Sequence, residues 1–248
     1  MRPGLKTRPA EPLAAADIDL TEEMAALWSS LGAVAPDRGR VVQFVSATTG
    51  EGASTIAREF AFYAAQRARR PVWLVDLDIF GATQHRAVNA NLNRFGPCGR
   101  PAAASPDGST FFSVQPPEAG PNGQPRSNAF YLSARPVAGG KLWVTRFHAE
   151  SLKPGQTVSI ARQARYWSAL RAHAEYVIVD TPAADRSTAA MTLAPVMDTS
   201  VLVLAAEMGD ARAPAGLKAS LEEAGGKVAG LVFNRARLQP PPFLQKLL

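Results

Sequence analysis

The stretch at residues 41–55, VVQFVSATTGEGAST, limits the fold more than any other part of this 248-residue chain. Apolar residues fill most of positions 41–45 and predict a short buried strand. Gly50 and Gly52 permit a tight turn, and an apolar face at helical spacing follows from position 54 onward. A strand, a glycine turn and a helix in this order present backbone N–H groups and a helix N-terminus to a bound anion. The stretch therefore predicts a phosphate-binding loop.

The loop lacks the lysine of the usual G-x-x-x-x-G-K-[ST] pattern. Ala53 stands where that pattern requires lysine, although Ser54 and Thr55 follow it as expected. A glycine turn without the lysine is as consistent with simple chain reversal as with a nucleotide site. The prediction therefore depends on the motifs further along the chain.

Acidic residues follow two further apolar runs. The predicted strand at 72–75 ends in Asp76 and Asp78, and the one at 176–179 ends in Asp180. Open α/β sheets bind ligands beyond the carboxyl ends of their strands. We therefore expect Asp76 and Asp78 to stand near the glycine turn if the strands are parallel neighbours. A turn or helix-cap role for these acids is the alternative.

Strands and helices alternate along most of the chain. Two more apolar strands are predicted at 201–205 and 228–233, with a helix between them at about 215–223. The pattern predicts an α/β fold: a doubly wound, mostly parallel sheet flanked by helices. A hairpin is expected on both sides of Gly139 and Gly140.

Two other helices are expected. One begins at Thr21, a plausible N-cap, and ends at Gly32, with an apolar face that includes Trp28 and packs on the domain, or else on a partner. The other places Ile160, Ala164, Trp167 and Leu170 on one face.

Composition divides the chain into a central domain and two tails. Residues 1–17 are rich in Pro, Ala and charge and predict a disordered tail. Residues 18–236 are expected to form one P-loop ATPase-like domain, interrupted at 96–128 by a Pro- and Gly-rich insertion loop without periodicity. Residues 237–248 are expected to be a C-terminal tail.

The overall composition favours a cytoplasmic protein. A single cysteine, Cys98, cannot form a disulfide framework, and no run approaches the ~18 apolar residues of a membrane span. The net charge of +6 suits nucleic acid, anionic lipid or nucleotide phosphates, but a solvated basic surface is the simpler explanation. His85, His148 and His173 are isolated from one another, so no zinc site is indicated.

Four motifs together carry a family resemblance. In order and spacing, SATTGEGAST, LVDLDIF, VIVDTPAAD and GLVFNR resemble the cytoplasmic ATPase domain of bacterial tyrosine kinases. These belong to the wider ParA and MinD group of P-loop proteins, and they accompany capsule, exopolysaccharide or holdfast export systems. The resemblance extends from about Thr21 to Arg235.

The resemblance implies a site for ATP or ADP with Mg²⁺. It implies that the nucleotide-binding residues are Gly50, Glu51, Gly52, Ala53, Ser54, Thr55, Asn234 and Arg235. Ser54, Asp76 and Asp180 would hold the metal, and Asp76, Asp78 and Asp180 would carry any catalysis. Asn234 would recognise adenine.

The departures from the family pattern concern catalysis and assembly. Ala53 removes the lysine that neutralises phosphate charge, with Arg70, Lys141 and Arg235 as cations that could in principle replace it. Phe80 replaces an arginine of the second motif. The family joins subunits into a ring through a Glu-x-x-Arg-x-x-Arg pattern. The matching residues here are Glu22, Ala25 and Trp28, so the sequence does not decide whether the chain forms a homo-oligomer. The family's C-terminal tyrosine cluster is replaced by QPPPFLQKLL.

These features predict a degenerate family member, a pseudo-kinase with little or no turnover. It would act as a cytoplasmic regulatory or scaffolding subunit of polysaccharide synthesis and export, beside an inner-membrane polysaccharide co-polymerase. One alternative is a ParA- or MinD-like positioning ATPase that binds DNA or membrane through Arg67–Arg70 or the apolar C-terminal tail. Others are an active tyrosine autokinase with a compensated P-loop and a structural relic that binds nothing. If the chain is a degenerate member of the kinase family, nucleic acid is not expected as its partner.

Overall fold

A computed structural model describes residues 19–120, 123–207 and 212–235. The strands, in chain order, are β1 (Arg40–Val45), β2 (Val72–Asp76), β3 (Ala102–Ala103), β4 (Phe112–Gln115), β5 (Leu132–Val137), β6 (Leu142–Phe147), β7 (Thr157–Ile160), β8 (Tyr176–Asp180), β9 (Thr199–Ala205) and β10 (Val228–Asn234). The helices are α1 (Thr21–Leu31), α2 (Ala53–Arg67), α3 (Thr83–Ala90), α4 (Leu92–Phe95), α5 (Ala164–His173), α6 (Ala189–Leu193) and α7 (Arg212–Glu223). Four 3₁₀ segments are η1 (Asn128–Tyr131), η2 (Ala138–Gly140), η3 (Ala149–Ser151) and η4 (Ala194–Val196).

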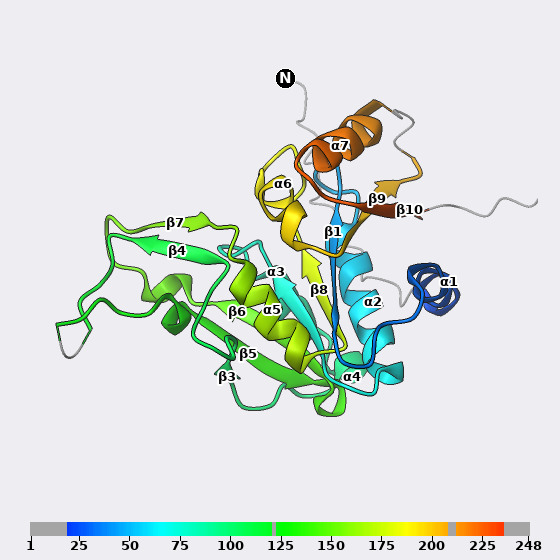
Figure 1. The fold of residues 1–248 in the computed structure, drawn as a ribbon. Coiled ribbons are helices and arrows are strands. Elements are labelled where there is room, and N and C mark those ends of the chain that lie inside the picture. Colours follow the sequence, from blue (N-terminus) through cyan, green and yellow to red (C-terminus); the bar gives the residue numbers. More distant parts are fainter. Residues whose placement is uncertain (1–18, 121–122, 208–211, 236–248) are drawn as a thin grey trace, which may run out of the picture.

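The apolar runs assemble into one large sheet in the order β10-β9-β1-β8-β2-β6-β5-β3 (Figure 1). Strands β10 to β6 in that order are parallel, and β5 and β3 continue the sheet antiparallel. Strands β5 and β6 form the hairpin expected around Gly139 and Gly140. The predicted fold class, a doubly wound and mostly parallel sheet, is confirmed.

Helices cover both faces of this sheet. Its parallel strands carry apolar side chains on both faces, and each face must be shielded from water. One face carries α1 to α4, with Ile56 and Phe60 of α2 in its core. The other face carries α5, where Trp167 and Leu170 are buried, together with α6 and α7. The β4–β7 ribbon packs on this second face and extends to one side in Figure 1.

The N-terminal helix α1 packs its apolar face on the domain, which is the first of the two arrangements expected for it. Its Trp28 ring lies 4.9 Å from that of Tyr176 and 6.3 Å from that of Phe60, centroid to centroid. The expected N-cap was wrong. Leu20 occupies the cap position, and the Asp19 carboxylate accepts hydrogen bonds from the Thr21 N–H and hydroxyl at 3.0 and 2.6 Å.

Two local expectations need correction. The stretch at 96–128 contains β3 and β4, and its Phe111 and Phe112 are buried. Ile160 belongs to β7, where it pairs with Phe112, so the helix begins only at Ala164. Strands of four residues between prolines and glycines are too short to leave a readable period.

The expected tails, residues 1–17 and 237–248, lie outside the described residues. Among the residues that are described, no helix combines the length and the apolar character needed to cross a bilayer.

Candidate functional site

The predicted phosphate loop joins β1 to α2. Gly50 and Gly52 adopt left-handed backbone with φ of 92° and 95°, a region that favours glycine. Helix α2 begins at Ala53, and its first hydrogen bonds run from Thr55 and Ile56 N–H to the Gly52 carbonyl, each at 3.0 Å. The N–H groups of Ala53 and Ser54 come before these bonds and have no earlier carbonyl within the helix, so they can face an anion.

A cavity of about 300 Å³ opens over this loop. Its lining residues follow β1, β2, β8 and β10: Ser46, Thr49, Gly50, Gly52, Ala53, Ser54, Asp78, Thr83, Asp180, Thr181, Pro182, Ala183, Arg186 and Arg235. The expected meeting of motifs at the carboxyl edge of the sheet is therefore present. The expected neighbour relation is different, because β8 lies between β1 and β2 and places Asp180 in register with both Phe44 and Asp76.

The predicted site residues divide into two groups. Those that line the cavity are Gly50, Gly52, Ala53, Ser54, Asp78, Asp180 and Arg235. Glu51 is buried instead, and its carboxylate accepts from the Thr48 N–H at 2.8 Å. Thr55 is exposed, and Asn234 donates its amide N–H to the Glu51 carbonyl at 2.9 Å. Asn234 thus holds the loop in this structure, and its part in adenine recognition stays a prediction.

Asp76 lies behind the cavity rather than on its wall. Its carboxylate accepts hydrogen bonds from the N–H groups of Asp78 and Gln84, both at 2.9 Å, and from the Thr83 hydroxyl at 3.2 Å. These bonds fix the turn that follows β2 and direct Asp78 to the cavity. In this structure Asp76 therefore has the turn-forming role that the sequence analysis gave as the alternative.

Gln84 connects the two acidic motifs to the phosphate loop. Its side-chain amide donates to the Asp180 carboxylate at 2.6 Å and to the Ser54 carbonyl at 2.8 Å. Asp180 also accepts from the Ser54 hydroxyl at 3.0 Å, and the Arg58 guanidinium donates to the Gln84 amide oxygen at 3.3 Å. The sequence analysis missed Gln84 and Arg58, because nothing in their local pattern distinguishes them from ordinary helix residues.

Burial sets the protonation of the acidic pair. Loss of hydration raises the pKa of Asp76, and the neighbouring Asp180 charge raises it further. The pKa of Asp180 is also raised, chiefly by burial, although hydrogen bonds from Gln84 and Ser54 and the Arg58 charge act in the opposite direction. Two buried carboxyls this close disfavour double ionisation.

We expect Asp180→Asn to stabilise the protein at about pH 8 by roughly 1–2 kcal/mol, since one pKa unit corresponds to about 1.4 kcal/mol. A raised native pKa favours folding below the unfolded-state pKa, near 4, and this advantage is lost as the pH rises through the raised values. The asparagine amide can accept from Gln84 and donate to Ser54, while it removes the charge that opposes Asp76.

Thermal unfolding of the wild type and Asp180→Asn at about pH 5 and about pH 8 checks this, with Asp37→Asn as the control because Asp37 is exposed in the turn before β1. An equal loss of stability between the two pH values in wild type and Asp180→Asn would refute the charge-repulsion account.

The segment that follows β8 forms a second wall of the cavity and is fastened to the phosphate loop. Ala184 N–H donates to the Ser46 carbonyl at 2.9 Å, and Asp185 N–H donates to the Ala47 carbonyl at 3.2 Å. The Asp185 carboxylate accepts from both the N–H and the hydroxyl of Thr49, each at 2.9 Å. The phosphate loop is therefore held by neighbouring backbone as well as by Gln84 and Asn234.

The cations suggested by the sequence do not all reach this site. Lys141 donates to the Ala68 carbonyl at 3.2 Å and Arg70 to the Ala172 carbonyl at 3.3 Å, both beside the amino end of β2, so they were wrong candidates. Arg235 does line the cavity. So does Arg186, which the sequence analysis missed, although its place six residues after Asp180 was a usable signal.

The basic cluster considered for DNA or membrane binding contacts the rest of the domain through the Arg67 side chain and the backbone of Arg69 and Arg70. The Arg67 guanidinium lies 3.5 Å from the centroid of the Tyr63 ring. The backbone N–H groups of Arg69 and Arg70 donate to the Glu175 carboxylate at 2.8 and 3.1 Å. The apolar tail considered for the same role lies outside the described residues.

Comparison with known proteins identifies the fold. No protein-family model matches the chain. The Staphylococcus aureus protein CapB, named as a tyrosine-protein kinase, is 30% identical over 82 residues, which are 33% of this chain and 36% of that protein. The match thus spans about a third of the relative's length.

Solved structures resemble the whole domain. The kinase domain of the Escherichia coli tyrosine kinase ETK has a TM-score of 0.61 at 18% identity, over 96% of this chain and 85% of that one. The chimerical protein CapA2B2 has a TM-score of 0.55 at 19% identity, over 90% and 88% of the two chains. The VpsO kinase domain also has a TM-score of 0.55 at 19% identity, over 88% and 96%. The chain therefore has the P-loop fold found in bacterial tyrosine kinase domains.

Proposed function

We propose that the chain is a degenerate P-loop domain of the bacterial tyrosine kinase type, which binds ATP or ADP with Mg²⁺ but turns it over slowly or not at all. It would serve as a cytoplasmic regulatory or scaffolding subunit in exopolysaccharide, capsule or holdfast synthesis and export. Its partner would be an inner-membrane polysaccharide co-polymerase. The kinase names of the structural neighbours and the CapA2B2 chimera support this direction.

The observation that carries the proposal is the position of Ala53. It is the first residue of α2, lines the cavity and stands between Gly52 and Ser54, where the lysine of a phosphate loop belongs. That lysine neutralises charge that develops during phosphoryl transfer, so its absence lowers turnover more than binding. Ser54, Asp78 and Asp180 still line the cavity and offer oxygen ligands of the kind that Mg²⁺ prefers.

The tyrosines supply a second argument against autokinase activity. All four tyrosines of the chain lie among the described residues, and all are buried: Tyr63, Tyr131, Tyr166 and Tyr176. Burial also raises the pKa of Tyr166 and Tyr176. A tyrosine that accepts phosphate must bring its hydroxyl to the nucleotide in the cavity. The four buried tyrosines are not placed to do this within the same domain.

Calorimetric titration with ATP and ADP, with and without Mg²⁺, tests the proposal. We expect the wild type to bind nucleotide and Ser54→Ala to lose most of the Mg²⁺ dependence, because its hydroxyl faces the cavity beside Asp180. Ser29→Ala is the matched control, since Ser29 is exposed on α1 and its hydroxyl donates to the Ala25 carbonyl of its own helix. Mass spectrometry after incubation with Mg-ATP should find no phosphotyrosine. Rapid nucleotide hydrolysis by the wild type would contradict the pseudo-kinase assignment.

A further inference from the structure

The cavity keeps positive charge in spite of Ala53. Among the described residues that line it, Arg186 and Arg235 are the cationic ones, and they stand on different walls. Arg186 follows β8 and Arg235 follows β10. The same cavity contains the carboxyls of Asp78 and Asp180, so a polyphosphate could enter it only if cations offset their charge.

The two arginines differ in their freedom to meet a ligand. The Arg235 guanidinium donates to the Gly50 carbonyl at 3.0 Å, and its backbone N–H donates to the Asn234 amide oxygen at 3.0 Å. Its φ of 59° is left-handed, which few non-glycine residues adopt. Arg235 is therefore committed to holding the phosphate loop.

Arg186 has a hydrogen-bonded backbone and a largely exposed side chain. Its own N–H donates to the Ala183 carbonyl at 3.0 Å, and the two residues before it are hydrogen-bonded to the phosphate loop. Its side chain is 55% exposed, and its ion pair with Asp78 spans 4.0 Å, the outer limit of such a contact. Exposed pairs of this kind contribute little, so a phosphate can displace the carboxylate. A guanidinium can also form bidentate hydrogen bonds to two phosphate oxygens, whereas an ammonium acts as a point charge.

We propose that Arg186 replaces the missing lysine as the phosphate-binding cation, reaching a nucleotide's phosphates from the β8 wall of the cavity instead of from the first turn of α2. The ligand class is a nucleoside di- or triphosphate, or pyrophosphate alone. This inference rests on the proposed nucleotide site and names the residue that makes binding feasible without the lysine.

The test is a titration of Mg-ADP and of inorganic pyrophosphate into four proteins: the wild type, Arg186→Gln, Ala53→Lys and the double variant. In the wild-type background we expect Arg186→Gln to weaken both ligands by about ten- to a hundredfold, the usual effect of losing a charge-assisted hydrogen bond. In the Ala53→Lys background the loss should be several-fold smaller, because the lysine then supplies the charge. Arg186→Lys should restore part of the affinity.

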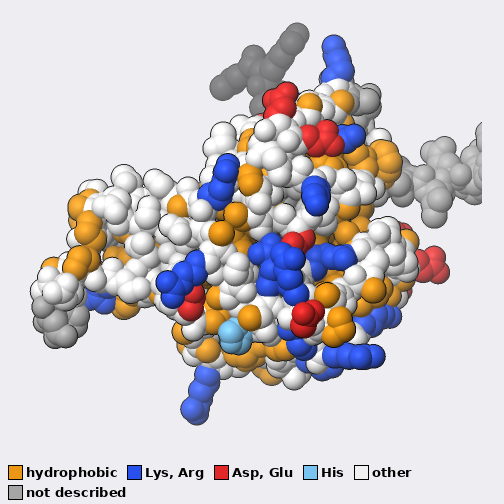
Figure 2. Space-filling model, in the orientation of Figure 1, with side chains coloured by type: hydrophobic (Ala, Val, Ile, Leu, Met, Phe, Trp, Pro, Cys, Tyr) orange, Lys and Arg blue, Asp and Glu red, His pale blue; other side chains and the backbone are white. Residues whose placement is uncertain are grey.

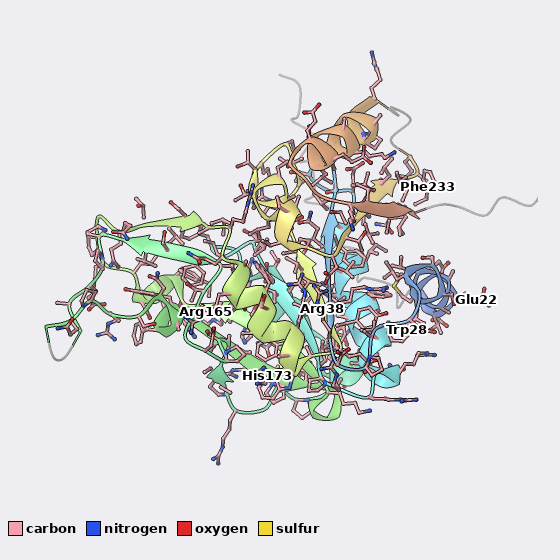
Figure 3. The ribbon with its side chains drawn as sticks, in the orientation of Figure 1. Glu22, Trp28, Arg38, Arg165, His173 and Phe233 are labelled. Carbon is pink, nitrogen blue, oxygen red and sulfur yellow. The ribbon has the colours of Figure 1, made fainter. Side chains whose placement is uncertain are left out.

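Arg38→Gln is the matched control. Arg38 is 65% exposed and also pairs with an aspartate, Asp198, at 3.3 Å, but it lies before β1, at the opposite edge of the sheet from the cavity. Basic side chains gather around this position on the face shown in Figure 2, and Figure 3 labels Arg38 there. The control should bind both ligands as the wild type does, and Arg186→Gln and Arg38→Gln should unfold at the wild-type temperature because both arginine side chains are exposed.

Each outcome decides between the two hypotheses. Equal binding by the wild type and Arg186→Gln overturns the role of Arg186 and leaves the nucleotide site intact. Binding by Ala53→Lys but not by the wild type also overturns it, because no cation then substitutes for the lysine. Failure of both the wild type and Ala53→Lys to bind overturns the proposed nucleotide site itself.

Discussion

Ala53→Lys should bind Mg-ATP about ten- to a hundredfold more tightly than the wild type, since a charge-assisted hydrogen bond contributes ~1.5–3 kcal/mol. The side chain at position 53 starts from the first turn of α2 and faces the cavity. A lysine there extends along the loop toward bound phosphates, as in intact P-loops. The gain should be larger for ATP than for adenosine, which has no phosphate to contact.

Ala26→Lys provides the control for net charge. Ala26 is exposed on α1, so its substitution adds the same charge far from the phosphate loop. Calorimetric titration of the two variants separates a local contact from general electrostatic attraction. If Ala26→Lys gains as much affinity as Ala53→Lys, position 53 does not face the phosphates. Even a tightly binding Ala53→Lys should form no phosphotyrosine by itself, because the tyrosines are buried.

Gly52→Ala should destabilise the protein more than the other glycine-to-alanine substitution in the phosphate loop, Gly50→Ala. A Cβ at Gly52 would lie 2.0 Å from the Asn234 amide nitrogen, so that side chain must leave the Glu51 carbonyl. The left-handed backbone adds about 1–2 kcal/mol of strain. Loss of a hydrogen bond adds about 0.5–1.5 kcal/mol.

Gly50→Ala separates these two contributions. Gly50 has nearly the same φ, but a Cβ there meets no atom within 4 Å. Both variants therefore incur backbone strain, and only Gly52→Ala also displaces Asn234. Chemical denaturation of the two should differ by about 1 kcal/mol or more, the value of the contact. Equal destabilisation would show that Asn234 moves aside without cost.

The fold was largely predictable because its signals are local. The buried runs of β1, β2, β8 and β9 consist mainly of β-branched and apolar residues, and acids or glycines follow most of them. Residues that follow parallel strands converge at one edge, so Asp78, Asp180 and the glycine loop could be assigned to one site from the sequence. The solved structures that resemble the chain agree with the predicted fold class.

Tertiary contacts decided the parts that were not predictable. The pairing of β4 with β7 brings Phe112 to Ile160, 48 positions away in the chain, and neither strand is long enough to show its own period. Gln84 became a site residue only because α3 brings its amide to Asp180. Lys141 was a wrong candidate because the strand order and its bond to the Ala68 carbonyl place it away from the cavity, which its position in the sequence did not reveal.

The bonding of Asp76 bears on how such a domain can evolve. Its carboxylate accepts hydrogen bonds that shape the turn after β2, so it is useful to the fold whether or not a phosphoryl group is ever transferred. Selection for shape alone would preserve it. A lineage could therefore lose catalysis and still keep an acid at the end of β2, which makes that acid a record of ancestry and leaves present chemistry to be read from the cations.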